Sequence, residues 1–302
     1  MMLSGQYPVY IQCPPRYALA VIFCLAIALP VMTGPVVAEE VADQSAPESQ
    51  SFLRFLDRQY LLDNGHDLPN KYGISPFVVK SSSDLKVDSL KFAFSEDDPL
   101  TSNPLVTMDE LSNEILTGGL IMDAWVLPFL NLYATVSYID GEMDTAVNIP
   151  GNSQPIPIDF TGTSYGLGGS LVMGYKKFFV LLDYNYMEMD TTAYEEKIPM
   201  SNFTTRVGWN FDYAWLPDIA WVSYIDTEFK GTFDLVQKVG EDVDPETVPP
   251  GATSVILQFE VAPYHTYAVG GQWELNDKFQ IISELGFDKV NSLMVALNYR
   301  WN

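Results

Sequence analysis

Hydrophobic and polar residues alternate with a period of two through most of the chain from Tyr72 onward. The pattern is clear in TGTSYGLGGSLVMGY (161–175), where large residues alternate with glycine and serine, and it recurs at 200–211 and 292–301. Successive side chains of a β-strand point to opposite faces, so a period of two predicts strands. We therefore expect an all-β protein.

The two faces of these strands differ in size as well as in polarity. The small and polar residues share one face with four charged residues: Asp183, Arg206, Glu284 and Arg300. A narrow barrel interior has room for glycine, serine and a few paired charges, whereas lipid accommodates leucine and aromatic rings. The large apolar face is therefore predicted to point outward into a membrane.

Short and long connections alternate along the chain, as they do in outer-membrane barrels. Short turns are predicted at 127–129, 176–177 and 276–278, and long polar stretches at 95–113, 141–160, 189–199 and 230–261. Strands are predicted at 72–80, 114–126, 130–140, 161–175, 178–188, 201–211, 219–229, 262–275, 279–287 and 292–301. The expected fold is an antiparallel up-and-down transmembrane barrel of about ten strands, with about eight or about twelve as alternatives.

Two further strand-like segments, 85–94 and 255–261, do not fit this up-and-down order. Inserting either one alone would break the parity of the barrel, so both are placed in hairpin extensions beyond the membrane. Aromatic residues gather near the predicted strand ends, as membrane interfaces favour. They form one group at Trp125, Tyr175, Phe178, Trp209 and Trp301, and another at Tyr138, Tyr186, Phe203 and Phe287.

The first 71 residues precede this pattern and divide into two segments. Residues 1–38 contain Arg16, a long apolar run and a small residue at Ala38, which predicts a secretory signal peptide, with a membrane-anchored N-terminus as the alternative. Its removal would leave no cysteine, because Cys13 and Cys24 both lie within it. Residues 39–71 are predicted to be a polar segment with a short amphipathic helix at 52–62 outside the barrel, which itself spans 72–302.

The charge of the chain is strongly acidic. It has 39 acidic and 16 basic side chains, a net charge of −23. This balance argues against nucleic acid as a partner, because phosphates need lysine and arginine. Acidic clusters such as Asp140, Glu142 and Asp144 could hold divalent cations, although solvated loops are the interpretation that we favour.

The last strand, SLMVALNYRWN, resembles the C-terminal assembly signal of Gram-negative outer-membrane β-barrels. Leu297, Tyr299 and Trp301 carry the resemblance, and Asn302 departs from it because that signal ends on the aromatic residue. The segment DAWVLPFLNLYATVSYIDG is also similar to uncharacterised proteobacterial barrels. The resemblance covers 72–302 and implies a porin-like place in the outer membrane, with outer-membrane lipid, lipopolysaccharide and the barrel assembly machinery as partners. It implies no particular activity.

Five charged residues are candidates for a polar network in the lumen: Asp123, Asp183, Arg206, Glu284 and Arg300. An unpaired charge in a barrel interior is costly, so these residues are expected to pair. Such a network could plug the lumen, or it could form a charged constriction that selects small solutes. A barrel of about ten strands is far narrower than the porins, which favours the plug.

His265 is a weak candidate for catalysis, because some outer-membrane barrels are lipid-processing hydrolases or proteases that use histidine. It shares its face with Tyr267 and Val269, which are predicted to face lipid, so we favour a histidine of the aromatic belt. No catalytic residue is therefore assigned, and no motif predicts a cofactor or a metal.

The expected function is a structural, adhesive or envelope-interaction role for a barrel with a plugged polar lumen. Three alternatives stay open. They are a narrow pore for small solutes, a lipid-active or proteolytic barrel enzyme, and a soluble β-sandwich.

Overall fold

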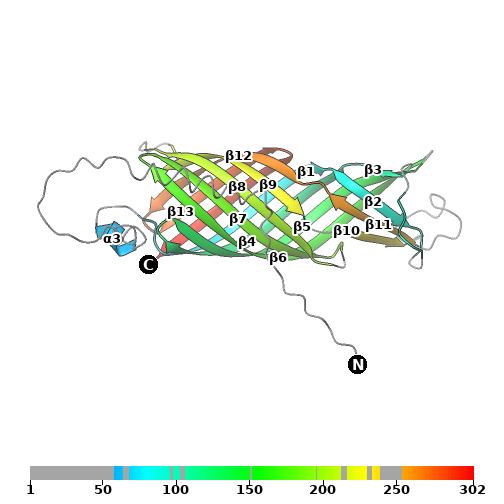
Figure 1. Cartoon of the computed structure of the whole chain (residues 1–302), viewed down its shortest axis with the longest axis horizontal. Coiled ribbons are helices and arrows are strands. Elements are labelled where there is room, and N and C mark those ends of the chain that lie inside the picture. Colours follow the sequence, from blue (N-terminus) through cyan, green and yellow to red (C-terminus); the bar gives the residue numbers. More distant parts are fainter. Residues whose placement is uncertain are drawn as a thin grey trace, which may run out of the picture. The chain divides into compact units, whose positions relative to one another are not determined.

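A single closed sheet dominates the computed structural model of the chain (Figure 1). The structure describes residues 58–63, 68–95, 98–102, 106–149, 152–194, 196–211, 216–229, 233–238 and 254–302. Within these ranges, ten long antiparallel strands form a ring, which closes because β5 pairs with both β4 and β6. The strands are β1 (Tyr72–Leu85), β4 (Leu111–Leu127), β5 (Leu130–Ile149), β6 (Asn152–Tyr175), β7 (Phe178–Thr191), β8 (Ile198–Asn210), β9 (Ile219–Phe229), β12 (Tyr264–Asn276), β13 (Phe279–Asp288) and β14 (Val290–Trp301).

The predicted antiparallel barrel is confirmed, and each predicted barrel strand corresponds to one of these ten strands. The soluble β-sandwich is wrong, because one sheet closes on itself and a sandwich has two facing sheets. The first and last strands meet at a seam, where β1 pairs with β14. Short turns join β4 to β5, β6 to β7 and β12 to β13. We call the end of the barrel that carries them the turn end, and the opposite end the cap end.

Three further strands form a separate sheet in the order β10-β11-β2, which we call the cap sheet. They are β2 (Val87–Ala93), β10 (Phe233–Lys238) and β11 (Ser254–Val261). The prediction that 85–94 and 255–261 lie outside the barrel sheet is confirmed. The two segments are not separate hairpin extensions, however, because they pair with each other, with Phe92 opposite Leu257. A two-residue strand, β3 (Thr107–Met108), pairs with the end of β5.

The polarity of the two faces reverses along β5 near Ile139. Towards the turn end, Val136 and Tyr138 are exposed on the outer face, whereas towards the cap end the exposed outer residues are Asp140 and Glu142. The inner face of β5 changes in the opposite sense: it carries polar residues towards the turn end and the buried, apolar Met143 towards the cap end. An apolar face points outward in lipid and inward in water, so the reversal marks the membrane boundary. The predicted loop at 141–160 is therefore wrong, because β5 and β6 continue as paired strands beyond the membrane.

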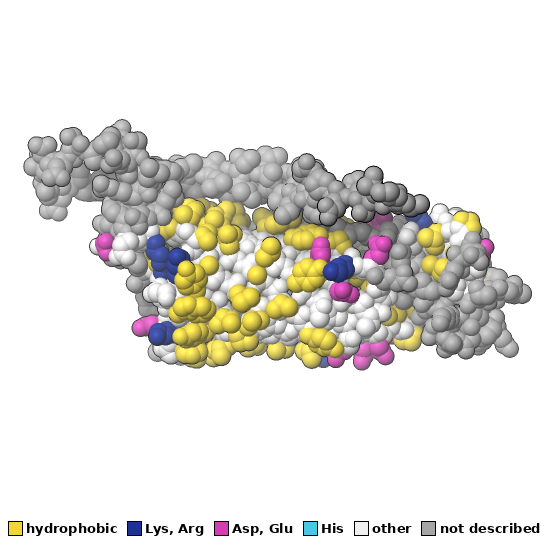
Figure 2. Space-filling view, turned by 90° about the horizontal axis from the view of Figure 1, so that it is seen from below, with side chains coloured by type: hydrophobic (Ala, Val, Ile, Leu, Met, Phe, Trp, Pro, Cys, Tyr) yellow, Lys and Arg dark blue, Asp and Glu magenta, His cyan; other side chains and the backbone are white. Residues whose placement is uncertain are grey.

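An apolar belt surrounds the barrel between the turn end and this boundary. Its exposed residues include Val78, Met122, Leu132, Leu167, Val222, Leu285 and Leu297. Hydrophobic side chains cover a broad zone of the surface, and charged side chains gather on either side of it (Figure 2). Aromatic rings contact one another near the turn end, for example Phe178 with Trp209 at a centroid distance of 4.0 Å. Trp125 is not an exposed member of the belt, because it shares the inner face of β4 with Asp123.

The N-terminal predictions fall largely outside the described residues. The signal peptide at 1–38 and the polar stretch that follows belong to this part, and they stay predictions. A short helix, α3, spans Arg58–Asp63, whereas the remainder of the predicted helix at 52–62 is not described. No helix among the described residues is long and apolar enough to cross a membrane.

Candidate functional site: the lumen and its outer mouth

An ion pair crosses the seam of the barrel near the turn end. Arg300 of β14 donates from Nη2 to Oδ1 of Asp123 on β4 at 2.7 Å, and both side chains are about 8% exposed. Gly73 of β1 lies directly opposite both residues, so the pair passes over a position without a side chain. Asn131 also donates to Asp123 at 2.7 Å, and Arg300 Nε donates to the backbone carbonyl of Asn70. The contact ties the last strand to β4 across β1.

A second cluster centres on Glu284 of β13. Trp221 Nε1 donates to Oε2 of Glu284 at 2.6 Å, the Ser223 hydroxyl donates to the same oxygen at 3.1 Å, and Arg206 Nη2 lies 3.2 Å from it. Gly270 is directly opposite both Trp221 and Glu284, so the indole reaches its acceptor over a bare backbone. The carboxylate is thus held by a cation and two neutral donors, as a charge in a narrow interior requires.

A third cluster centres on Asp183 of β7. The Tyr133 hydroxyl donates to Oδ1 of Asp183 at 2.8 Å, and the Ser170 hydroxyl donates to Oδ2 at 2.5 Å. The ring of Tyr133 lies over Gly168, its direct partner across β5 and β6. Asp183 is therefore held by hydroxyl donors, whereas the structure brings Arg300 to Asp123 and Arg206 to Glu284.

The three clusters share one construction, in which a long side chain crosses a glycine on the intervening strand. A Cβ built on Gly168 would come within 2.3 Å of Tyr133, and one on Gly270 within 2.4 Å of Trp221. Gly208 lies in the same way under Phe179, its direct cross-strand partner. Glycine allows such close approach because it has no Cβ. The glycine-rich inner face is thus filled by side chains of neighbouring strands.

An apolar cluster lies at the cap end of the lumen. The cap sheet contributes Phe92, Val255, Leu257, Phe259 and Val261, and the barrel wall contributes Leu85, Leu111, Ile139, Met143, Val147, Ile156, Ile158, Phe160, Tyr194 and Ile198. We call this set the mouth cluster. Phe259 is 0% exposed and Leu257 is 1% exposed. Partly buried residues of β7, β9 and β12 pack against it as well, so eight of the ten barrel strands contact it.

Sequence reasoning missed the mouth cluster because it assigned 141–160 to a loop. The period of two continues through Ile139, Met143 and Val147, but the apolar residues now point inward. That uninterrupted alternation was the available signal. The pairing of 85–94 with 255–261 had no comparable signal, because the two segments are far apart in the chain.

His265 lies on the outer face of β12, about half exposed, with Nε2 3.9 Å from a carboxylate oxygen of Asp288. Its ring stacks with that of Tyr224 at a centroid distance of 5.7 Å. No serine or threonine hydroxyl in the described part of the chain forms a hydrogen bond with its ring. Among the described residues, no group of three or more His, Cys, Asp or Glu side chains is placed to hold a metal ion.

The predicted assembly-signal residues lie on the outer face of β14. Leu297 and Trp301 are both exposed there, and Trp301 stacks with Tyr299 at a centroid distance of 5.6 Å. Asn302, the departure from the signal, accepts a hydrogen bond from the backbone N–H of Lys71 through its side chain. The chain end is therefore tied to the residue that precedes β1.

Helix α3 lies close to the turn end of the lumen. Arg58 donates to the carbonyl of Pro69, beside Asn70, whose own carbonyl accepts from Arg300. Burial, and to a smaller degree the positive charge of Arg300, lower the pKa of Arg58. The segment between α3 and β1 thus lies against the ion pair at the seam.

Comparison with known proteins finds no matching family model and no matching curated protein. Among solved structures, the transport unit of the autotransporter AIDA-I from Escherichia coli is 9% identical, with a TM-score of 0.39 over 86% of this chain and 100% of that chain. The translocator domain of autotransporter NalP from Neisseria meningitidis is 10% identical, with a TM-score of 0.37 over 84% of this chain and 96% of that chain. The toluene transporter TodX from Pseudomonas putida is 8% identical, with a TM-score of 0.31 over 78% and 89%.

With identities this low, the assignment of the fold rests on the chain's own geometry. One antiparallel sheet closes on itself, its outer face is an apolar belt, and its inner face is polar at the level of that belt. Closure leaves no unpaired strand edge in lipid, which a spanning sheet requires. The chain has the fold of a Gram-negative outer-membrane β-barrel.

Proposed function

We propose that this chain is an outer-membrane barrel with a plugged lumen and a structural, adhesive or envelope-interaction role. The mouth cluster is the observation that carries the proposal. Inward-facing apolar residues from most of the wall converge on Phe259 and Leu257, which are almost completely buried. Close-packed apolar side chains obstruct hydrated solutes across the part of the mouth that they fill.

The polar clusters in the lumen support the same proposal. Arg300 forms an ion pair with Asp123, and Arg206 forms one with Glu284, so neither cation points alone into the lumen. A selective pore needs charges that face a passing solute. Paired charges that cross glycines instead bind the strands to one another, which favours a structural role.

The strands beyond the membrane boundary supply a surface for interaction. The outer faces of β5 and β6 expose Asp140, Glu142, Asp144 and Asp159, while their inner faces are buried in the mouth cluster. Such a face is acidic and rigid, because the paired strands hold it in position. A partner with a basic surface would complement it.

Conductance in planar bilayers tests the plugged lumen. The purified barrel, shown to be folded by heat-modifiable migration on gels, is added to both sides of a bilayer, and the current is recorded. We expect no discrete conductance steps. Steady single-channel steps from the unmodified protein would contradict the plug and favour a narrow pore for small solutes.

A further inference from the structure

Four segments connect the cap sheet to the barrel sheet, and the two shortest of them lie side by side. Lys86 alone separates β1 from β2, and Ala262 and Pro263 separate β11 from β12. Ala262 N–H donates to the carbonyl of Lys86 at 2.9 Å, which joins the two links. Lys86 and Pro263 are exposed, so neither side chain is fixed by packing. We call these two adjacent links the hinge; the other two connections, 94–106 and 230–232, are longer.

Backbone pairing leaves the cap sheet independent of the barrel wall. In the part of the chain that the structure describes, β2, β10 and β11 pair with one another and with no barrel strand. Each barrel strand, by contrast, is paired on both sides within the ring. Displacing the cap sheet would therefore break apolar contacts of the mouth cluster but no hydrogen bond of the barrel ladder. Units with their own hydrogen bonding commonly open separately from the rest of a protein.

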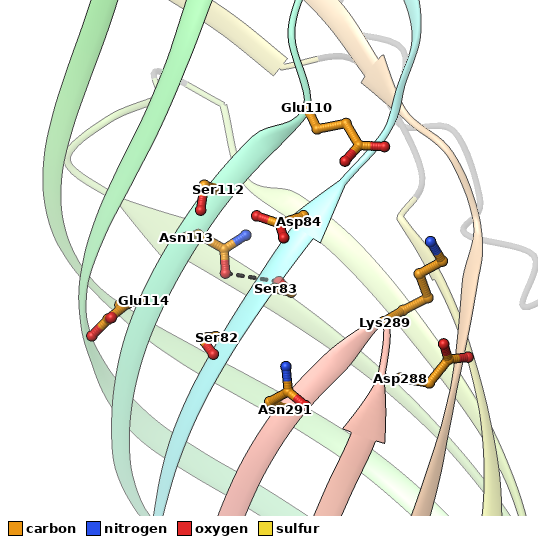
Figure 3. Close-up of a pocket in the computed structure, with 10 residues that line it drawn as sticks. All are labelled: Ser82, Ser83, Asp84, Glu110, Ser112, Asn113, Glu114, Asp288, Lys289 and Asn291. Carbon is orange, nitrogen blue, oxygen red and sulfur yellow. Dashed lines mark hydrogen bonds between the residues drawn. The ribbon is translucent and has the colours of Figure 1, made fainter.

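A polar cavity lies beside the end of β1, where Asp84 is two residues before Lys86 in the chain (Figure 3). Its volume is about 360 Å³, and its lining comprises Ser82, Ser83, Asp84, Glu110, Ser112, Asn113, Glu114, Asp288, Lys289 and Asn291. The cavity exists because β13 and β14 are joined by a tight turn at Lys289 before they reach the cap end. β1 runs two residues further towards the cap end than Ser83, its last partner of β14. All of its lining residues that the structure describes are polar or charged, so the end of β1 borders a polar space on this side rather than an apolar core.

We propose that the cap sheet is a hinged lid, which turns on β1 and β12 and controls access from outside to the wall residues at the mouth, above the polar clusters of the lumen. In the closed position, Phe92, Leu257 and Phe259 fill the mouth. In the open position, they leave the wall as one unit, and inward-facing wall residues such as Ile139 become accessible to solvent. The ten-stranded ring and its polar clusters stay intact in both positions.

Labelling of single cysteines in the full chain tests the lid. Cys13 and Cys24 are first replaced by serine, and one buried residue at a time is changed to cysteine: Leu257 in the lid, Ile139 in the wall, or Ala268 in the barrel lumen. Leu257 and Ala268 are both about 1% exposed, so they form a matched pair. A membrane-impermeant maleimide is added to barrels in vesicles, and circular dichroism follows the barrel under the same conditions.

We expect Leu257→Cys and Ile139→Cys to react at the same rate while the barrel is folded, and Ala268→Cys to stay protected. Phe92→Ala should raise both rates by roughly 100-fold, because it weakens the closed position by the contacts of a buried ring. Lys91→Ala, at the exposed neighbouring position on β2, should leave the rates unchanged.

Two results would overturn the lid. Labelling of Leu257→Cys only at denaturant concentrations that also unfold the barrel would show that the cap sheet does not open separately. Labelling of Leu257→Cys without Ile139→Cys would show fraying of a strand rather than movement of a unit. If Leu257→Cys fails to fold, Val255→Cys on the same face replaces it. These outcomes do not depend on the conductance test of the plug, which uses the unmodified protein.

Discussion

Substitution of Gly168 by alanine tests whether glycines make the lumen contacts possible. The new Cβ would lie 2.3 Å from Cζ of Tyr133, and ordinary contact begins at 3.4 Å, so the ring would have to move by roughly 1.1 Å. That shift would break the 2.8 Å hydrogen bond from Tyr133 to Asp183. Overpacking and the loss of a hydrogen bond to a carboxylate together predict a loss of about 2–5 kcal/mol in the free energy of unfolding.

The loss can be measured by urea titration of barrels in phospholipid vesicles, followed by tryptophan fluorescence. Gly118→Ala is the matched control, because a Cβ at this outer glycine would have nothing within 4 Å of it, and the change in stability should stay within about 0.5 kcal/mol. In a Tyr133→Ala background, Gly168→Ala should cost little further stability, because the clash is gone. Equal effects of Gly168→Ala and Gly118→Ala, or a cost that persists without the tyrosine ring, would refute the reasoning.

Three further predictions concern the seam, the mouth cluster and the aromatic belt. Arg300→Met should lower the free energy of unfolding by about 3–5 kcal/mol, because Asp123 would stay buried without its cation, and Asp123→Leu in the same chain should restore most of the loss. Burial raises the pKa of Tyr194, so the folded state keeps a proton that the unfolded chain releases, and stability should fall as pH rises above about 10. Tyr194→Phe should reduce this dependence in urea titrations at two alkaline pH values. His265→Ala should leave any lipase or protease activity of the purified barrel unchanged. A loss of activity would favour the alternative that the chain is a barrel enzyme that uses this histidine.

The alternation of side chains predicted the barrel strands because lipid imposes one rule on all of them. Most outer positions within the membrane must be apolar, so residues such as Leu167 and Val207 repeat at intervals of two. The same rule misled the prediction beyond the membrane, where water reverses it. At Asp140 the outer face becomes charged, which resembles a loop when only the outer residues are considered. The helix at 52–62 was predicted from a local pattern, of which the structure describes Arg58–Asp63.

The partners within the lumen could not be derived from the sequence. Arg206, Arg300 and three carboxylates were assigned to the inner face by parity, but several pairings would satisfy that assignment equally well. The choice depends on the register of three adjacent strands, which places Gly73 between Arg300 and Asp123, and Gly270 between Trp221 and Glu284. A shift of one residue would turn these side chains to the opposite face.

The sequence by itself determined the strands, their inner and outer faces and the membrane-spanning belt, because these properties follow from local alternation and from the chemistry of lipid. The tertiary structure alone decided which charges meet and how the mouth is filled. Both depend on segments that are distant in the chain, such as β2 and β11, and on the absence of side chains where others must cross. No local pattern encodes such a contact, because it exists only when the ring is closed.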